Sequence, residues 1–219
     1  MMDIDDLLQE VSAHAVPQET RDLQELTRCW VAERAAPELL EWPEELMGRV
    51  LERIRRQIDI IEEATGSMDA STNFKLIIIQ TELERFKFLV RSFLRARLKK
   101  IDAHPHHILS LLPAQPSLLS GTEHAYLTNH QALLANHYHA SFLSQFPVPL
   151  QKLDDTTGGV SMVERPDENA AVFVRALREV EEVFVEGTER RFRMARGDVW
   201  VVRWRAVKGL VRAGMVEVI

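Results

Sequence analysis

The chain has 219 residues, of which 46% are hydrophobic and 27% are charged, as in ordinary globular proteins of one large or two small domains. Its single cysteine, Cys29, excludes an internal disulfide and a multi-cysteine zinc site. The apolar runs, such as Leu76–Ile79, are too short to span a membrane, and we expect no signal peptide because no basic and apolar leader is present.

Charge is distributed unevenly along the chain, whose net charge is −6. Residues 1–70 carry a net charge of −10, whereas residues 71–101 carry +6. The basic segment therefore has acidic neighbours within its own chain. A solvated basic stripe on a packed helix is favoured over a nucleic-acid contact, which stays open as the alternative.

Residues 1–18 are expected to form a flexible N-terminal peptide, which Pro17 separates from the next helix. Four apolar residues of this peptide recur at helical spacing: Ile4, Leu7, Leu8 and Val11. Such a short helix is marginal by itself. One interpretation is a frayed terminus or a first core helix, and the other is a helix that folds in the groove of a partner.

Two helices are expected next, over residues 20–41 and 43–66. Pro37 should interrupt the first, because proline cannot continue a helix. The second begins with Pro-Glu-Glu, a sequence that favours a helix start, and it ends at a glycine. Ser71 or Thr72 is then expected to cap the following helix.

Residues 74–101 are predicted to form the central helix, because they contain no glycine and no proline. One face of this helix is apolar and holds Ile79, Phe86, Val90, Phe93 and Ile101. Another face is basic and holds Lys87, Arg91, Arg95 and Lys99. Further leucines widen the apolar arc to more than half of the circumference. A helix of this kind needs neighbours on several sides, so a partner protein is expected.

Arg97 falls on the apolar side of the central helix, between Val90 and Phe93 by helical angle. A charge at this place must be paired or must reach the solvent beyond the helix end. The pattern leaves both outcomes open. If it is paired, a bidentate contact to a carboxylate of a packed neighbour is expected, either within the chain or across a subunit interface.

The remainder of the chain changes character at residues 149–168, a polar linker rich in proline and glycine. Before it, a short helix over residues 105–112 and a longer one that starts with the capping-box sequence Ser120–Glu123 are expected. After it, residues 169–219 show the alternation of short strands, with one short helix over residues 205–213. The predicted fold is therefore mainly α, with a helical-bundle A domain over residues 19–148 and a small β-rich B domain after the linker.

Residues that could carry chemistry show no supporting context. Seven of the eight histidines lie between His104 and His139, without a carboxylate at metal-ligand spacing, so surface histidines are favoured over a metal site. The glycine pair Gly158-Gly159 lacks the lysine and the flanking elements of a phosphate loop. Cys29 is expected to be a packing residue. We therefore expect no catalytic residues, no cofactor and no metal.

Four segments in register resemble one family, the Sld-five type of GINS subunit. RCWVAERAAPELLEW is similar to its WINE+FAPELL signature, and ELERFKFLVRSFLRARLKKID is similar to its central helix. HYHASFLSQFPVPLQKLDD resembles the end of its helical domain, and VVRWRAVKGLVRAGMVEVI resembles its C-terminal segment. The resemblance extends from about residue 20 to residue 219. The chain departs from the family at Ala35-Ala36, where an aromatic residue is usual, and contact there should be thinner.

The resemblance implies a non-catalytic nuclear protein. GINS is a heterotetramer, so the three other GINS subunits are the implied partners. The assembly bridges the MCM ring and its companion factor in the replicative CMG helicase, and it supports the leading-strand polymerase indirectly. The first residues also resemble the peptide by which fungal members dock a trimeric replisome adaptor. The positions carried over are Ile4, Asp5, Asp6, Leu7 and Leu8.

Candidate site residues follow from the resemblance and from the apolar pattern. Those assigned to the subunit interface or the core are Trp30, Arg34, Leu39, Phe86, Val90, Phe93, Arg97, Tyr138 and Phe142. Those assigned to docking of the B domain are Trp204, Leu210, Val211, Val218 and Ile219. A scaffold subunit of the helicase is the favoured function, and a separate helical nucleic-acid-binding protein that uses the basic stripe is the alternative. A metal hydrolase is disfavoured by the histidine spacing.

Overall fold

The computed structural model describes residues 16–64, 70–155, 161–184 and 191–219, and of Ala70–Thr72 and Phe184 it describes the backbone only. Contacts between Cα atoms divide the chain into two compact units. The first comprises residues 1–30 and 43–93, and the second comprises residues 31–42 and 94–219. The predicted adaptor peptide and Gly66 lie outside the described residues.

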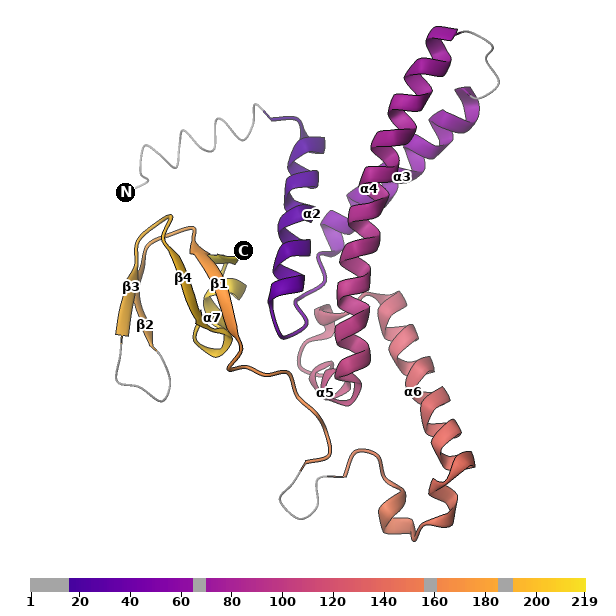
Figure 1. Cartoon of the computed structure of the whole chain (residues 1–219), viewed down its shortest axis with the longest axis vertical. Helices are drawn as coiled ribbons and strands as arrows, with labels where there is room; N and C mark the ends of the chain where they lie inside the picture. Colours follow the sequence, from indigo (N-terminus) through magenta and orange to yellow (C-terminus); the bar gives the residue numbers. More distant parts are fainter. Residues whose placement is uncertain (1–15, 65–69, 156–160, 185–190) are drawn as a thin grey trace. The chain divides into compact units, whose positions relative to one another are not determined.

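The first unit is helical. It contains most of α2 (Gln18–Ala35), all of α3 (Glu44–Ala64) and the N-terminal two thirds of α4 (Ala70–Ala103). Figure 1 shows α3 beside this part of α4. The buried residues of the unit come from all three helices: Leu26, Leu46, Met47, Val50, Leu76, Leu83, Val90 and Phe93. This burial confirms Val90 and Phe93 of the predicted apolar face of α4, whereas Ile79 and Phe86 of that face are half-buried.

Polar contacts join α2 to α3 within the first unit. Arg49 lies 3.0 Å from the carboxylate of Asp22, and Arg53 lies 3.2 Å from that of Glu19. Arg53 also lies over the ring of Phe86 on α4, with its guanidinium carbon 5.7 Å from the ring centroid. These contacts connect α2 to α3 and α3 to α4 at the surface of the unit.

The second unit begins with the end of α2 and the irregular segment of residues 36–42, and continues with the end of α4. Its further helices are α5 (Pro105–Leu111), the 3-10 helix η1 (Pro116–Leu118), α6 (Gly121–Ser141), η2 (Leu143–Gln145) and η3 (Val148–Gln151). A core cluster joins several of these elements and consists of Leu39, Ile101, Ile108, Leu118, Leu119 and Leu127.

The C-terminal part of the second unit is a small antiparallel sheet domain. The strands β1 (Ala171–Ala176), β4 (Val199–Arg203) and β5 (Val216–Val218) form a sheet in the order β4-β1-β5. The strands β2 (Val180–Phe184) and β3 (Arg191–Met194) form a separate hairpin ladder. The helix α7 (Trp204–Arg212) follows β4 directly (Figure 1). Helices followed by a small β-rich domain confirm the predicted fold class.

One buried cluster forms the interior of the sheet domain. Its members from the sheets and α7 are Val172, Val174, Ala176, Val180, Val183, Met194, Trp204, Val207, Val216 and Val218. Ala36, from the irregular segment after α2, belongs to the same cluster. A domain of this size buries little apolar area by itself, so this extra contribution from outside the domain stabilises it.

Several local predictions differ from the structure. Helix α2 ends at Ala35, two residues before Pro37, because the residue before a proline is driven out of the helical region. Ser71 and Thr72 do not cap α4, because this helix already includes Ala70. The capping box at Ser120 is confirmed, since its side chain accepts from the backbone N–H of Glu123 and the Glu123 side chain accepts from that of Ser120.

Candidate interaction surfaces and the buried polar cluster

Arg97 is the centre of a buried polar cluster in the second unit, with an exposed fraction of 0%. Its Nε and Nη2 atoms lie 2.7 and 3.1 Å from the two carboxylate oxygens of Glu123, a bidentate pairing. Nη1 donates to Glu33 at 3.1 Å and to the Leu40 carbonyl at 2.8 Å, and Nη2 also donates to the Leu118 carbonyl at 2.8 Å. All five N–H groups of the guanidinium thus have an acceptor.

Glu123 takes part in two structures at once. It occupies the third position of α6, where its Oε2 accepts from the Ser120 backbone N–H at 3.0 Å. The same carboxylate receives the guanidinium of Arg97 from α4. The capping box restrains the rotamer of Glu123 independently of Arg97, which lowers the entropy lost in the pairing.

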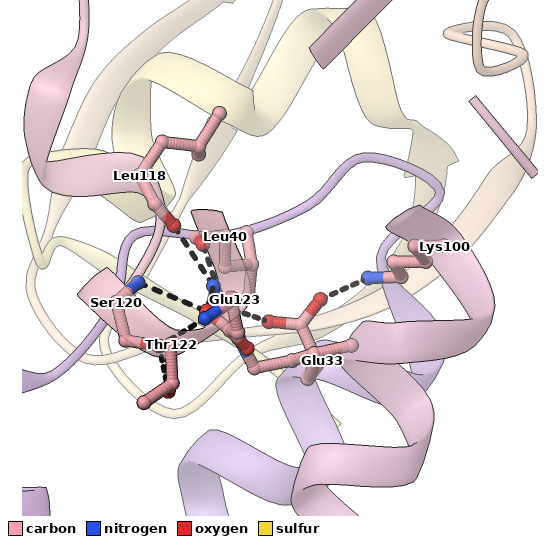
Figure 2. A network of polar contacts seen from close by, with 8 residues as sticks. Glu33, Leu40, Lys100, Leu118, Ser120, Thr122 and Glu123 are labelled. Atoms are coloured by element: carbon pink, nitrogen blue, oxygen red, sulfur yellow. Dashed lines mark hydrogen bonds and ion pairs between the residues drawn. The ribbon is translucent and has the colours of Figure 1, made fainter. Parts of the chain in front are cut away.

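Glu33 on α2 is the second carboxylate of the cluster and is 1% exposed. Its Oε1 accepts from Nζ of Lys100 at 2.6 Å (Figure 2). Lys100 also donates to the Glu38 carbonyl at 2.7 Å. Burial lowers the pKa of Lys100 from its ordinary value, and the adjacent Glu33 carboxylate opposes this shift. The two cations and two buried carboxylates balance, as a buried charge cluster requires.

The cluster holds the irregular segment that connects α2 to α3. Arg97 and Lys100 bind the carbonyl groups of Leu40 and Glu38 in this segment, which are not part of any helix. The guanidinium of Arg97 also lies over the ring of Trp42, 5.2 Å from its centroid. Every oxygen of the two buried carboxylates has a donor, so the arrangement offers no free base and fits a structural role.

The structure decides between the two alternatives for Arg97. The side chain does not reach the solvent beyond the helix end, and its carboxylate partners belong to this chain. The predicted pairing of Arg97 with carboxylates is confirmed. The carboxylates are Glu33 and Glu123 of the same chain, so the pairing lies within the chain and not across a subunit interface. Sequence reasoning missed Glu33, Lys100 and Glu123, although an acidic residue at the third position of a capping box was a usable signal.

An exposed apolar face runs along the N-terminal half of α4, in the first unit. It consists of Phe74, Ile77, Ile78 and Phe88, which are 65%, 59%, 50% and 58% exposed. These residues fall within an arc of about 100° of the helix, on a different side from the buried residues Leu76, Leu83 and Val90. We call this set the α4 face. Its large side chains share one side of the helix along about four turns, with Thr81 and Arg85 between Ile78 and Phe88 on the same side. Exposed apolar side chains gathered on one side of a helix are typical of protein interfaces.

A groove adjoins the α4 face and has a volume of about 850 Å³. Leu23 and Thr27 of α2 form one wall, and α4 forms the other from Ile77 to Leu89, including Phe86. Glu82, Glu84 and Arg85 contribute the charged part of the lining. The combination of an apolar floor with charged borders suits an amphipathic helix from another protein.

A second exposed apolar surface lies at the C-terminal end of α6 and in the two 3-10 helices after it. Its most exposed members are Leu133, Phe142, Phe146, Val148 and Leu150. Tyr138, Phe142 and Phe146 follow one another at ring-centroid distances of 5.9 and 6.3 Å. Nothing in the described part of the second unit covers these side chains, so they are also available to a partner.

The remaining predicted interface residues divide into buried and accessible positions. Leu39, Val90 and Phe93 are buried, whereas Trp30, Phe86 and Tyr138 are half-buried and Arg34 is exposed. Four of the five predicted docking residues of the B domain contribute to its interior. Trp204 and Val218 are buried in its core, and Leu210 and Val211 pack against that core. Ile219 is half-buried at the end of β5.

The predicted basic stripe of α4 is largely exposed but partly neutralised. Lys87 and Arg91 lie 3.1 and 3.7 Å from the carboxylate of Glu84. Arg95 and Lys99 are exposed, and they make no ion pair within the described residues. Two unpaired cations offer few contacts to a phosphate backbone.

No group of three or more metal-ligating side chains occurs among the described residues. His130 lies 3.7 Å from Asp102, which also accepts from the Tyr126 hydroxyl at 2.9 Å, and Tyr126 stacks on His130. Burial lowers the pKa of His107. Among the same residues, no helix combines the length and apolar character needed to cross a membrane.

Comparison with known proteins assigns both parts of the chain to one family. Residues 51–142 match the model of the "GINS complex protein helical bundle domain". Residues 166–219 match the model of the "DNA replication complex GINS protein SLD5 C-terminus". The matched segments correspond to the central helices and to the sheet domain.

Curated relatives match over the full length. A "DNA replication complex GINS protein SLD5" of Chaetomium globosum is 53% identical, with 100% of both chains covered. The protein of the same name from Schizosaccharomyces pombe is 39% identical over 99% of each chain. That of Yarrowia lipolytica is 37% identical over 97% of this chain and 83% of its own.

Proposed function

The chain belongs to the SLD5 family of GINS complex proteins, and from this we propose that it is a non-catalytic subunit of the heterotetrameric GINS complex. In this role it acts through surfaces, as a scaffold of the replicative CMG helicase in the initiation and elongation of chromosomal DNA replication. The names of its relatives support a place in a DNA replication complex. A nuclear location follows from this role.

The α4 face is the observation that carries the proposal. Four large apolar side chains, at least half exposed, are costly in a solitary protein, at about 25 cal/mol for each Å² left in water. The groove beside them, lined by Leu23 and Phe86, extends the same surface. We infer that helices of sister GINS subunits cover this surface in the assembled complex. The exposed end of α6 provides a second contact of the same kind.

Each of the proposed domains has its own role in this assembly. The A domain, residues 19–148, holds the sister subunits, and the B domain, residues 169–219, is joined to it by the linker of residues 149–168. The segment 1–18 recruits a trimeric replisome adaptor through Ile4, Asp5, Asp6, Leu7 and Leu8. The assembled complex contacts the MCM ring and its companion factor and supports the leading-strand polymerase indirectly.

Direct contact with DNA is weak or indirect in this proposal. Only Arg95 and Lys99 of the basic stripe are exposed without an ion pair in the described part of the chain, because Lys87 and Arg91 both lie beside the carboxylate of Glu84. A stand-alone nucleic-acid-binding protein would need more phosphate contacts than these two provide.

Co-expression with the three other GINS subunits tests the proposal. We expect the chain to aggregate when expressed alone and to be recovered in a soluble complex of four different chains when co-expressed. A measured mass for that complex, together with equal amounts of the four chains, supports the proposal. A soluble monomer that ignores the other three subunits and binds DNA with a steep salt dependence would instead support the alternative.

A further inference from the structure

The sheet β4-β1-β5 has an apolar outer face. Along β1, Val172, Val174 and Ala176 point into the core, so Phe173 points to the opposite side. Val201 is the register partner of Phe173, and the two are 55% and 56% exposed. Val199, which is 53% exposed, lies two residues before Val201 on the same face. We call Phe173, Val199 and Val201 the outer sheet face.

This composition departs from the usual pattern of an antiparallel sheet. A sheet that packs one face on a core normally presents polar residues on the other face. Here three apolar side chains of two adjacent strands are contiguous and each is more than half exposed. A contiguous apolar patch of this kind indicates a surface that another protein covers.

The charges at the border of the face are mainly positive. Arg175 is the register partner of Val199, and its guanidinium lies 3.3 Å from the carboxylate of Glu217 on β5. Arg203 follows Val201 on the same face, is exposed and makes no ion pair within the described residues. The carboxylate of Glu217 is already paired, so Arg203 leaves an unbalanced positive charge beside the apolar residues. A complementary partner carries an acidic residue at this border.

The dimensions of the face fit a helix. Neighbouring strands lie about 4.8 Å apart, and residues two positions apart on a strand are separated by about 7 Å. A helix with its side chains is about 10 Å wide, so one apolar stripe of a helix covers these three residues. We propose that the outer sheet face docks one amphipathic helix of a sister GINS subunit, with an acidic residue beside its apolar stripe against Arg203.

This inference rests on the proposed function, because it needs the assembled complex. It differs in part from the sequence expectation for the B domain, which named residues on the core side of the sheet and on α7. That expectation also named Ile219, which lies beside Phe173, with its N–H donating to the Phe173 carbonyl at 3.0 Å. Trp204 and Val218 stabilise the interior of the domain, whereas the outer sheet face supplies the contact. The B domain thus has two apolar sides, one for its own core and one for a partner.

The test uses the co-expressed four-chain complex with a photoreactive amino acid at Val201. Illumination should link this position to a helical segment of one sister subunit that contains acidic residues, identified by mass spectrometry of the digest. The matched control places the same amino acid at Glu181, which is exposed on β2, outside the outer sheet face, and it should not label that segment.

A charge reversal adds a second readout. Arg203→Glu should lower the cross-linked fraction from Val201 several-fold and make it less sensitive to salt, whereas Arg178→Glu, at another exposed arginine, should leave it unchanged. A complex that forms normally while Val201 labels no protein, a second copy of this chain, or a segment that is not helical overturns the inference alone. Failure of the wild-type chain to form any complex overturns the proposed function, and the inference with it.

Discussion

The guanidinium of Arg97 meets the carboxylate of Glu123 side by side, with Nε and Nη2 at 2.7 and 3.1 Å from its two oxygens. Arg97 lies on α4, and Glu123 lies in the first turn of α6, 26 residues later. The pairing joins two helices through a planar fork that a lysine cannot reproduce. Arg97, a charged residue on the apolar side of α4, thereby contacts α2 through Glu33, α6 through Glu123 and the segment after α2 through the Leu40 carbonyl.

Replacement of Arg97 by methionine should destabilise the fold strongly. It leaves Glu33 and Glu123 buried with fewer partners, and breaking a buried pair in this way costs about 3–5 kcal/mol. Arg97→Lys should recover only part of the loss, because a lysine keeps the charge but not the bidentate geometry. Chemical denaturation of the co-expressed complex, compared between the variants, provides the measurement.

Arg95 provides the matched control for Arg97, since it is an exposed arginine on the same helix. Arg95→Met should change the free energy of unfolding by less than about 0.5 kcal/mol. Equal losses for the two substitutions would show that the buried cluster has no special role. An Arg97→Met variant as stable as the wild type would contradict the structural role of the cluster.

The spacing of apolar residues and the positions of proline, glycine and capping residues predicted the secondary structure well, because these signals depend only on residues that are close in the sequence. The long breaker-free segment, the Pro-Glu-Glu start of α3 and the capping box at Ser120 each depend on neighbouring residues, and each was placed correctly. The partners of Arg97 could not be predicted in the same way. Glu33 lies 64 residues away, and only the fold decides which of many acidic residues meets this cation.

The outer sheet face was missed for a related reason. Alternation along β1 and β4 was visible in the sequence, but the side that would face the core was not. The sequence therefore suggested Trp204 and Val218 as docking residues, although the domain buries them in its own interior. Aromatic and aliphatic residues look alike in a sequence whether they stabilise a core or contact a partner.

Two phenylalanines of α4 should separate stability from assembly. Phe93 is 1% exposed, so Phe93→Ala should cost about 3–5 kcal/mol in the free energy of unfolding. Phe86 was expected to be equally central, but it is half-buried at the groove, with Arg53 over its ring. Phe86→Ala should therefore cost only about 1 kcal/mol in the free energy of unfolding.

The comparison needs both unfolding and binding measurements. Phe86→Ala should reduce recovery of the four-chain complex by more than its effect on stability explains, because the groove loses an anchor. If Phe86→Ala and Phe93→Ala change stability and assembly in the same proportion, the groove is not part of an interface.

Charged residues on the α4 face should abolish assembly without unfolding the chain. Ile77 and Phe88 are 59% and 58% exposed, so Ile77→Asp with Phe88→Asp removes little buried contact. An aspartate buried in an apolar interface, however, is left without a partner and is strongly unfavourable. We expect the double variant to be more soluble alone, to keep its helical circular dichroism, and to lose its sister subunits in a pull-down.

A control for the α4 face places the same charge on α3, away from the face. Arg55→Asp with Arg56→Asp changes exposed residues outside the face and should leave assembly intact. Loss of the complex in this control as well would mean that the first unit tolerates no added acid, and the loss of assembly in Ile77→Asp with Phe88→Asp would no longer point to the α4 face.

The ion pair of Glu168 with Lys208 should give the sheet domain a small acid sensitivity. The hydrogen bond from Lys208, at 2.7 Å, lowers the pKa of Glu168 below its ordinary value of 4.5. A carboxylate of this kind stabilises the fold fully above its unfolded pKa, and the contribution is lost as the pH falls through the folded pKa. Thermal melting between pH 3 and 7 should be less pH-dependent in Glu168→Gln, whereas Glu164→Gln, at another exposed position, should follow the wild type.

Deletion of residues 1–12 should separate recruitment from assembly. These residues include the adaptor-binding positions Ile4, Leu7 and Leu8, and they precede α2, the first described helix. The truncated chain should therefore still recover its sister subunits in equal amounts, because the α4 face and its groove are unchanged. A pull-down with the trimeric adaptor should then lose binding, since a short helix contributes its affinity through these few apolar anchors. Substitution of Leu7 and Leu8 by serine in the full chain is the sharper variant, and normal capture of the adaptor by either protein would exclude the N-terminal peptide as its binding site.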